Sequence, residues 1–253
     1  MSLAARSLRV SVGSRSLVSD LTTEFAPGEF VAVLGRNGSG KTLTLHTLAG
    51  LRGAAEGEVL LEGRPLRQLA RAAIARRVGV LTQDSEEGFA TTALESVLLG
   101  RYPHLKLLQW EGPSDRSIAH DALARVDMAE LALRSTETLS GGERRRVAIA
   151  AVLAQQPQVF LLDEPTNHLD PHHQLAVLSL FRELTRAGRT VIATLHDPTL
   201  AARFADRALL LFGDGRWQSG PAAEVLTTER LGELYLMPLL ELGADGRRVF
   251  VGA

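Results

Sequence analysis

The sequence Gly35-Arg36-Asn37-Gly38-Ser39-Gly40-Lys41-Thr42 matches the pattern G-x-x-x-x-G-K-[ST] at every defined position. It follows the apolar run of residues 30–34 and opens a helically patterned segment, residues 42–51. Glycines let successive N–H groups point inward at an anion, and the helix N-terminus adds a positive dipole end. We expect Lys41 to reach the β- and γ-phosphates of a nucleoside triphosphate and Thr42 to help hold Mg²⁺.

Short apolar runs elsewhere in the chain indicate a parallel α/β sheet. Residues 159–162 and 190–195 are unbroken apolar or β-branched runs separated by helical patterns, as expected for strands covered on both faces. Residues 1–30 and 57–68 instead alternate and contain glycines, which favours a small antiparallel sheet. The predicted fold class is α/β: a P-loop NTPase (RecA-like) core with a small antiparallel β subdomain and an inserted helical subdomain.

The inserted subdomain is predicted at residues 84–155, where helical patterns such as 92–99 and 118–126 are separated by Tyr102-Pro103 and Gly112-Pro113. Residues 1–83 and 156–253 would then form the core of one domain spanning residues 1–253. Residues 208–212 and 216–219 flank the turn Gly213-Asp214-Gly215 and predict a hairpin, after which we expect a terminal helical segment.

Composition excludes several classes of protein. The chain has 253 residues, 45% of them hydrophobic and none of them cysteine, so disulfides and thiol chemistry are absent. The 28 Lys and Arg residues nearly balance 29 Asp and Glu residues, which argues against nucleic acid as a partner. No apolar run reaches the ~18 residues of a spanning helix, and we interpret the Arg- and Ser-rich start as a strand rather than a targeting peptide.

Two acids follow the predicted strand at residues 159–162, at its carboxyl end beside the phosphate crevice. Asp163 suits the Mg²⁺ shell, and Glu164 suits polarising an attacking water. The alternative is that both merely cap the following helix.

The stretch Leu139-Ser140-Gly141-Gly142-Glu143 is open to two interpretations. Ser140 and Glu143 have the spacing of a helix capping box, but two adjacent glycines also leave the helix N-terminus open to an anion. Here the chain resembles the ATP-binding cassette (ABC) ATPases, whose signature is this LSGGE. The order GRNGSGKT, Gln83, LSGGE, LLDE, NHLD and His196 reproduces the family's order over nearly the whole chain.

The resemblance implies further roles. Family members form a head-to-tail dimer, in which Ser140, Gly141 and Gly142 would belong to the signature that closes on ATP held by the partner. Gln83 would touch Mg²⁺ or the attacking water, and His196 would grip the γ-phosphate and position Glu164. Asp170 matches the acid of a loop that crosses the dimer interface.

Two features depart from, or compete with, this assignment. Family members usually have an aromatic residue that stacks on adenine, and Val12 occupies that position, so weaker adenine selection is expected. His168, His172 and His173 could suggest a metal site, but Pro171 lies between them and no carboxylate follows at ligand spacing.

The resemblance also implies partners. Residues 92–104 and 167–174 are similar to bacterial importers of iron-siderophore, haem and cobalamin, whose cassettes power a separate transmembrane permease. We therefore expect an ATP- and Mg²⁺-dependent homodimer at the cytoplasmic face of the bacterial inner membrane, bound to two permease subunits and served by a solute-binding protein. The alternatives are a soluble iron–sulfur assembly cassette or a ribosome-acting cassette; the latter usually has tandem cassettes or long insertions, for which this chain has no room.

Overall fold

The structure is a computed structural model that describes residues 2–83, 91–106, 108–244 and 247–253. Its centre is a six-stranded sheet in the order β10-β9-β3-β8-β7-β6. The pairs β9·β3, β3·β8, β8·β7 and β7·β6 are parallel, and only the edge pair β10·β9 is antiparallel. The strands are β3 (Phe30–Leu34), β6 (Val78–Leu81), β7 (Val159–Leu162), β8 (Thr190–Thr194), β9 (Arg207–Leu211) and β10 (Trp217–Pro221).

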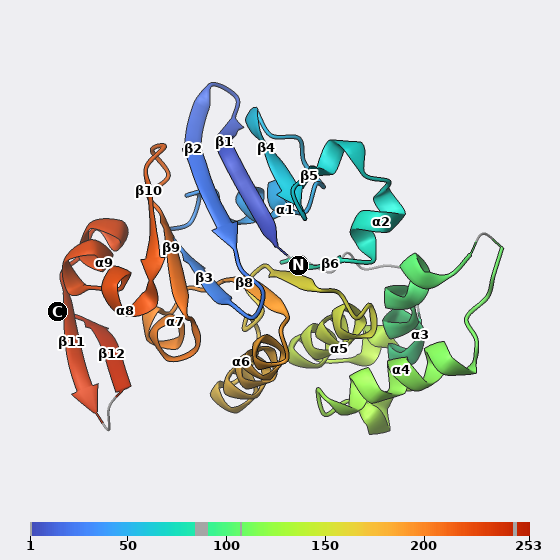
Figure 1. Ribbon diagram of the computed structural model, residues 1–253. Helices are drawn as coiled ribbons and strands as arrows, with labels where there is room; N and C mark the ends of the chain where they lie inside the picture. The colour runs from blue at the N-terminus through green and yellow to red at the C-terminus, as the bar shows by residue number, and fades with distance from the viewer. Residues whose placement is uncertain (1, 84–90, 107, 245–246) are drawn as a thin grey trace.

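A second sheet lies above the first in Figure 1 and has the order β2-β1-β4-β5. Its strands, all antiparallel, are β1 (Leu3–Val12), β2 (Arg15–Phe25), β4 (Glu56–Leu61) and β5 (Arg64–Pro65). Together the two sheets confirm the predicted α/β class with a parallel core sheet and a small antiparallel one.

Strand β3 explains why the core strands are apolar throughout. Its residues Phe30, Ala32 and Leu34 belong to the apolar cluster shared with the helices below the sheet. Val31 and Val33 belong to the opposite cluster, together with α1 (Lys41–Leu48) and the antiparallel sheet. Because both faces are covered, every position of the strand is buried.

The lower face of the sheet is covered by α5 (Gly141–Ala154), α6 (Pro171–Arg186) and α7 (Pro198–Phe204) (Figure 1). Phe160 on β7 and Phe181 on α6 meet edge to face, with their ring centroids 5.5 Å apart. This geometry is the favoured one for aromatic pairs, so it fixes how α6 packs under the sheet.

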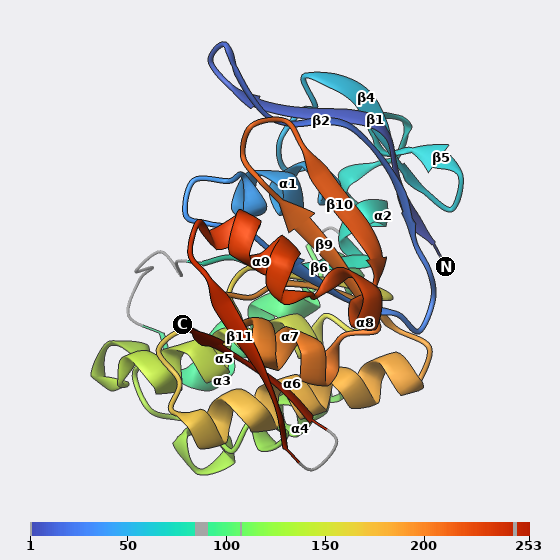
Figure 2. The same cartoon turned by 90° about the vertical axis from the view of Figure 1, so that its left-hand side faces the viewer.

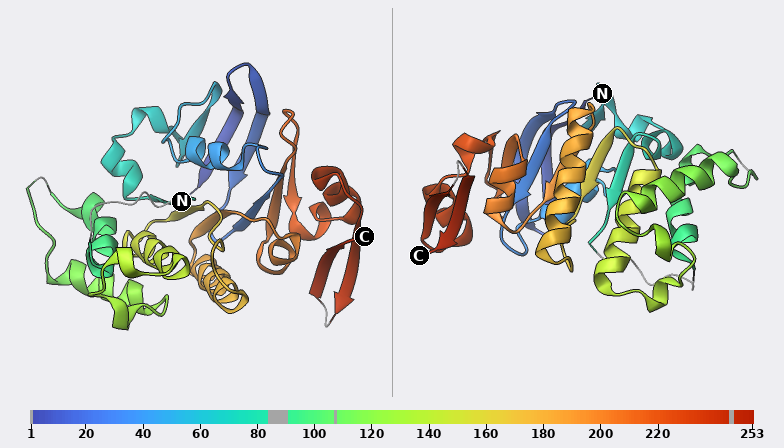
Figure 3. Two further views of the ribbon diagram at one scale, coloured as in Figure 1. Left: turned by 180° about the vertical axis from the view of Figure 1, so that it is seen from behind. Right: turned by 90° about the horizontal axis from the view of Figure 1, so that it is seen from below.

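The helices drawn in green lie at one end of the molecule, and the chain's last elements, drawn in red, lie at the other (Figure 3, right). The described part of residues 84–155 folds as α3 (Ala93–Leu98), α4 (Pro113–Ala124), α5 and the short 3₁₀ turns η2 (Leu99–His104), η3 (Ala129–Leu131) and η4 (Thr136–Thr138). Gly112-Pro113 separates the helical segments as expected: Gly112 is the N-cap of α4 and Pro113 its first residue, a position to which proline is well suited.

The C-terminal region departs from the prediction of a purely helical segment. After α8 (Ala222–Val225) and α9 (Thr228–Tyr235), the chain forms an antiparallel hairpin of β11 (Leu239–Ala244) and β12 (Arg247–Gly252) (Figure 2). Phe250 of β12 is buried in the core cluster that also contains residues of α7. The hairpin therefore depends on a tertiary contact that local patterning does not reveal.

Two short elements complete the fold, η1 (Leu66–Gln68) and α2 (Arg71–Ala75), both between the antiparallel sheet and β6. Among the residues that the structure describes, no helix has the length and apolar character needed to cross a membrane.

Candidate active site

The loop between β3 and α1 has the backbone of an anion-binding turn. Gly38 and Gly40 have φ values of 77° and 98°, which lie in the left-handed region that glycine adopts without strain. Gly40 is the N-cap of α1 and provides no side chain to cap the helix. The N-terminal end of α1 therefore points its positive dipole end at the space in front of the loop.

Lys41 lies at the start of α1 with only 6% of its surface exposed. Its Nζ donates to the carbonyl oxygens of Gly35 (2.8 Å) and Arg36 (3.3 Å). Burial lowers the pKa of this ammonium group, and the negative charges of Glu164 and Asp163 partly oppose the shift. An anionic ligand in front of the loop would compensate for this burial.

A cavity of about 570 Å³ lies in front of the loop and joins residues distant in sequence. Its walls are formed by Val12, Arg15, Leu17, Asn37, Gly38, Gly40, Lys41, Thr42, Leu43, Gln83, Glu164 and His196. Besides Gly38 and Gly40, seven of the predicted site residues therefore line this one cavity: Val12, Asn37, Lys41, Thr42, Gln83, Glu164 and His196. Gly35, Arg36 and Ser39 belong to the same loop but not to the cavity wall.

The two acids after β7 are both buried but have different surroundings. Asp163 is 1% exposed; its Oδ1 accepts a 2.7 Å hydrogen bond from the Thr194 hydroxyl. Its Oδ2 is buried and has no hydrogen-bond partner within the described part of the chain. An oxygen of this kind, together with the hydroxyl of Thr42 at the cavity wall, fits the hard oxygen donor set that Mg²⁺ prefers.

Glu164 has φ = 49°, so the chain turns sharply directly after the strand. The turn brings its Oε1 to 2.5 Å from Nε2 of His196, and its Oε2 accepts a hydrogen bond from the Asn167 side chain. The carboxylate is therefore held from both oxygens at the wall of the cavity. This is the position required of a group that orients an attacking water.

His196 follows β8 and is supported from the C-terminal region. The phenol of Tyr235, the last residue of α9, donates to the backbone oxygen of His196 at 3.3 Å. Burial, with the nearby charge of Asp197, raises the pKa of this phenol, so it remains a donor across the physiological range. The final helix thus helps place the histidine.

The signature residues lie elsewhere. Ser140 is the N-cap of α5: its Oγ accepts from the Glu143 N–H at 3.2 Å, and Glu143 Oε2 accepts from the Ser140 N–H at 2.7 Å. The capping box therefore exists, yet Ser140 and Gly141 are exposed and none of Ser140, Gly141 and Gly142 lines the cavity.

Gly142 lies against the segment that precedes α6. A Cβ at this position would lie 3.0 Å from the carbonyl oxygen of His168, so this close approach favours glycine. Asp170 caps α6 through the His173 N–H (2.9 Å), which lowers the pKa of Asp170, and its other oxygen lies 2.8 Å from His173 Nδ1. This contact accounts for His173 without a metal ion.

Four site residues were missed by the sequence analysis. Arg145 of α5 is buried and donates to the backbone oxygens of Thr82 (2.6 Å), Glu164 (2.8 Å) and Asp163, so it joins α5 to the segments that follow β6 and β7. Arg15 at the cavity wall donates to Gly213 O at 2.9 Å. Asn167 and Thr194 hold the two acids, and only their nearness to known motifs could have indicated them.

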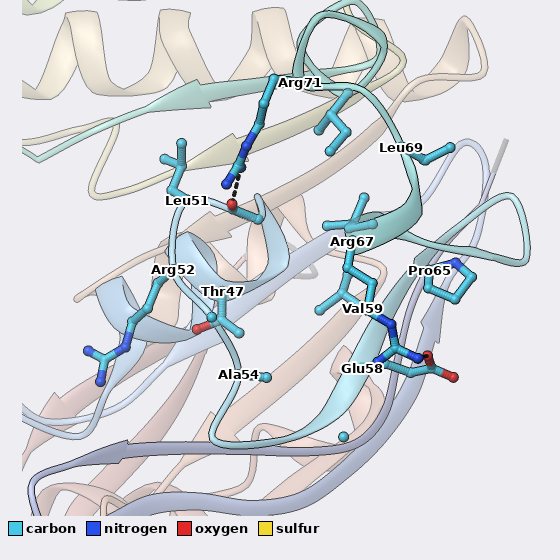
Figure 4. Close-up of a pocket in the computed structure, with 15 residues that line it drawn as sticks. Thr47, Leu51, Arg52, Ala54, Glu58, Val59, Pro65, Arg67, Leu69 and Arg71 are labelled. Atoms are coloured by element: carbon cyan, nitrogen blue, oxygen red, sulfur yellow. Dashed lines mark hydrogen bonds and ion pairs between the residues drawn. The ribbon is translucent and has the colours of Figure 1, made fainter.

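A second cavity, of about 490 Å³, lies among the end of α1, β4 and α2 (Figure 4). Arg71 donates to the Gly50 carbonyl, and Arg67 lies 3.6 Å from the Glu58 carboxylate. None of the predicted site residues is among the described residues that line it. The cavity in front of the 35–42 loop is therefore the candidate active site.

Comparison with known proteins identifies the family to which the chain belongs. The ABC transporter family model matches residues 18–167. The hemin import ATP-binding protein HmuV of Streptomyces coelicolor is 41% identical (93% of this chain, 84% of the relative), and the ferric enterobactin transport ATP-binding protein FepC of Escherichia coli K12 is 37% identical (92% and 86%).

Solved structures show the same cassette fold and confirm the predicted fold class. A chain of an inward-facing ABC transporter described as of metal-chelate type superposes with a TM-score of 0.87, at 28% identity over 100% of this chain and 97% of that one. The dimeric cassette MJ0796 bound to ADP and phosphate gives 0.76, at 27% identity over 87% and 98%. The chain belongs to the ABC transporter family, as one of its ATP-binding, ATP-hydrolysing cassettes.

Proposed function

We propose that this chain is the ATP-hydrolysing subunit of an importer that takes up a metal chelate of the iron-siderophore, haem or cobalamin type. The relatives are named for hemin, ferric enterobactin and achromobactin transport. In this proposal, two copies of the chain associate with two subunits of a membrane permease at the cytoplasmic face of the bacterial inner membrane. A separate solute-binding protein delivers the chelate.

One observation supports the dimeric mechanism best. The loop at residues 35–42, Gln83, Glu164 and His196 surround one cavity, while the signature at residues 140–142 lies outside it and exposes Ser140 and Gly141. A helix N-terminus exposed in this way can meet an anion from another molecule. Each chain would therefore provide two half-sites, and ATP would be enclosed between the loop of one copy and the signature of the other.

The chemistry follows from the residues of the cavity and from Asp163, which directly precedes Glu164 but is not among the described residues that line the cavity. Amides of the loop and Lys41 bind the phosphates, and Thr42, Gln83 and Asp163 would hold Mg²⁺, which when bound neutralises phosphate charge and orients the nucleotide. Glu164 orients the attacking water and accepts its proton, while His196 and Asn167 hold the Glu164 carboxylate in place. Closure and reopening of the dimer would transmit the energy of hydrolysis to the permease.

The permease contact is proposed on η2, the 3₁₀ turn at Leu99–His104. Leu99 and Tyr102 expose 52% and 59% of their surface, and Arg76 of α2 donates to the Pro103 carbonyl at 2.6 Å. The turn also contacts α5 through His104, which lies 2.8 Å from the Gln155 carbonyl oxygen. A permease that contacts the exposed Leu99 and Tyr102 would therefore transmit movement both to α2 and to α5, the helix that begins at the signature.

Copurification from native membranes tests the proposal. A tagged chain extracted with detergent should bring a polytopic membrane protein, identified by mass spectrometry, and Tyr102→Asp should lose it while still binding ATP. Leu240→Asp, which alters an equally exposed apolar residue on the C-terminal hairpin, is the control and should keep the partner. Recovery of the unmodified chain with soluble iron–sulfur assembly proteins alone would contradict the importer function.

A further inference from the structure

We propose that Thr194 is a positioning residue whose single hydroxyl orients both acids of the active site. The inference rests on the proposed use of a divalent cation with ATP. The hydrogen bond from Thr194 occupies one oxygen of Asp163 and so determines which oxygen remains available to that cation. The same hydroxyl holds the backbone turn that aims Glu164. Thr194 belongs to none of the motifs recognised in the sequence, although it lies two residues before His196.

The position of Thr194 is set by strand pairing. Thr194 is the last residue of β8, and β8 pairs in parallel with β7 so that Leu162 lies opposite Ala193. One step further along both strands, Thr194 and Asp163 lie beside each other at the carboxyl edge of the sheet. Thr194 is 0% exposed, so its hydroxyl must find its partners within the protein.

The donor and acceptor in each of the two hydrogen bonds of this hydroxyl can be assigned in only one way. The Glu164 N–H donates to Thr194 Oγ1 at 2.7 Å, so this bond uses a lone pair of the oxygen. The hydroxyl proton is then donated to Asp163 Oδ1, also at 2.7 Å. An ionised carboxylate can only accept, so the chain of bonds from Glu164 N–H through Thr194 to Asp163 is fully satisfied.

The consequence for Asp163 is that its two oxygens are no longer equivalent. Oδ1 is occupied by Thr194, and the carboxylate plane is fixed by this bond. Oδ2 is buried without a hydrogen-bond partner in the described part of the chain, an arrangement that costs free energy unless a ligand supplies a partner. Oδ2 is therefore the oxygen that Thr194 leaves available to a cation bound with the nucleotide.

The consequence for Glu164 concerns its backbone. A φ of 49° is unfavourable for a glutamate, and such conformations persist only where the surroundings hold them. Thr194 holds the N–H of this residue, and the Arg145 guanidinium holds its carbonyl oxygen at 2.8 Å. The turn carries the side chain to His196 and Asn167, so the same hydroxyl acts on the water-orienting group as well as on the cation ligand.

The test compares three variants of the full-length chain. Thr194→Val has nearly the same shape but no hydroxyl, Thr194→Ser keeps the hydroxyl and loses the methyl group, and Thr194→Ala lacks the hydroxyl without adding bulk. The main readout is the Kd of a fluorescent ATP analogue, measured with Mg²⁺ and with EDTA, which requires no turnover. The second readout is the split of ATPase activity into kcat and KM.

We expect Mg²⁺ to strengthen nucleotide binding about tenfold less in Thr194→Val than in the unmodified chain, with the Kd in EDTA unchanged within about twofold. The kcat of Thr194→Val should fall about 10- to 100-fold, and Thr194→Ser should restore both properties. The unchanged Kd in EDTA shows that the variant is folded. If Thr194→Val is insoluble, Thr194→Ala against Thr194→Ser poses the same question.

Two results would overturn the inference: a Thr194→Val protein with the Mg²⁺ response and kcat of the unmodified chain, or a Thr194→Ser protein as impaired as Thr194→Val. The second result would mean that the hydroxyl alone does not restore the site and that the fit of the whole side chain is what matters. Because the readouts use the purified cassette, failure of the importer proposal in the copurification experiment would leave this test intact.

Discussion

Glu164 shows how much of the mechanism depends on single hydrogen bonds. Its carboxylate contacts His196 through one oxygen and Asn167 through the other, and its backbone contacts Thr194 and Arg145. A residue held at two points on its side chain and two on its backbone loses little further freedom when water and nucleotide arrive. At the scale of the residue, the site is arranged for positioning before any ligand binds.

The Glu164→Gln variant should separate binding from hydrolysis. Glutamine keeps the size of the side chain and one of its two acceptor oxygens but cannot accept the proton, so kcat should fall by about 10²- to 10⁴-fold. The Kd for ATP should remain within about threefold of the unmodified value, because the amides of the loop and Lys41 are untouched. Equilibrium binding and phosphate release measure the two quantities.

Lys41→Ala is the matched comparison, since it removes a phosphate-binding cation from the same cavity and should weaken binding itself. If Glu164→Gln retains near-normal turnover, another group is the base.

Val12 is the residue at which we expect selection of the nucleobase of ATP to be weak. It lies at the end of β1 with 52% of its surface exposed and lines the cavity, but it has no aromatic face. Val12→Tyr should lower the KM for ATP about three- to tenfold, because a ring that stacks on the base adds roughly 0.5–1.5 kcal/mol. Steady-state kinetics with ATP and GTP measures the change.

Val12→Leu adds apolar area without a π-face and should leave the KM nearly unchanged. If Val12→Tyr has the same KM as the unmodified chain, with ATP and with GTP alike, then Val12 does not contact the nucleobase.

At the scale of the element, α6 is fixed to the sheet by a charged contact as well as by Phe181. Arg182 of α6 forms a two-pronged ion pair with Asp206, the residue that precedes β9, with a 2.7 Å contact to Oδ1. Oδ2 of Asp206 also accepts the Phe30 N–H at 2.9 Å. Burial works to raise the pKa of Asp206, but these hydrogen bonds outweigh it, so its pKa lies below the usual value.

A lowered folded-state pKa gives the sign of the pH dependence. The ion pair contributes stability above the unfolded pKa of about 3.9, and this contribution is lost as the pH falls through the folded-state pKa. Asp206→Asn should therefore lower the free energy of unfolding at pH 7 by about 0.5–1 kcal/mol, a modest amount because the pair is partly exposed to solvent. The difference between the two proteins should shrink below about pH 4.

Urea unfolding at several pH values measures this effect. Asp121→Asn, at an exposed position of α4, should change stability little at any pH. A deficit of Asp206→Asn that persists undiminished at pH 3 would mean that packing, not charge, is responsible.

At the scale of the whole molecule, the separation of the signature from the cavity predicts complementation between copies. Lys41→Ala should disable the loop half-site, and Ser140→Arg should disable the signature half-site. In a head-to-tail homodimer, a mixed pair combines one intact loop with one intact signature and so restores one site. Random mixing makes about half the dimers mixed, which restores about a quarter of the sites.

ATPase activity of the mixture, compared with each variant alone, measures this recovery. Two copies of the same variant serve as the control and should remain inactive. An activity that only equals the sum of the two separate variants would rule out sites shared between copies.

Local sequence patterns establish the class of the fold and predict the residues of the candidate site. The loop at residues 35–42, the acids after β7 and the signature are each short patterns, because glycine conformations, strand ends and helix caps are local properties of the chain. The expected C-terminal helix, in contrast, gave way partly to a hairpin, since Phe250 gains its burial from a core cluster shared with α7 rather than from local propensity.

The way in which these patterns combine depends on tertiary packing. Thr194 reaches Asp163 across 31 residues of sequence, and Arg145 reaches Thr82 across 63, through strand register and helix packing that no local pattern encodes. The same packing leaves the signature outside the cavity of its own chain. The physical reason is that a buried polar group needs a hydrogen-bond partner close to it in space, and that partner can lie far away in the sequence. A sequence motif contains only residues that are neighbours along the chain.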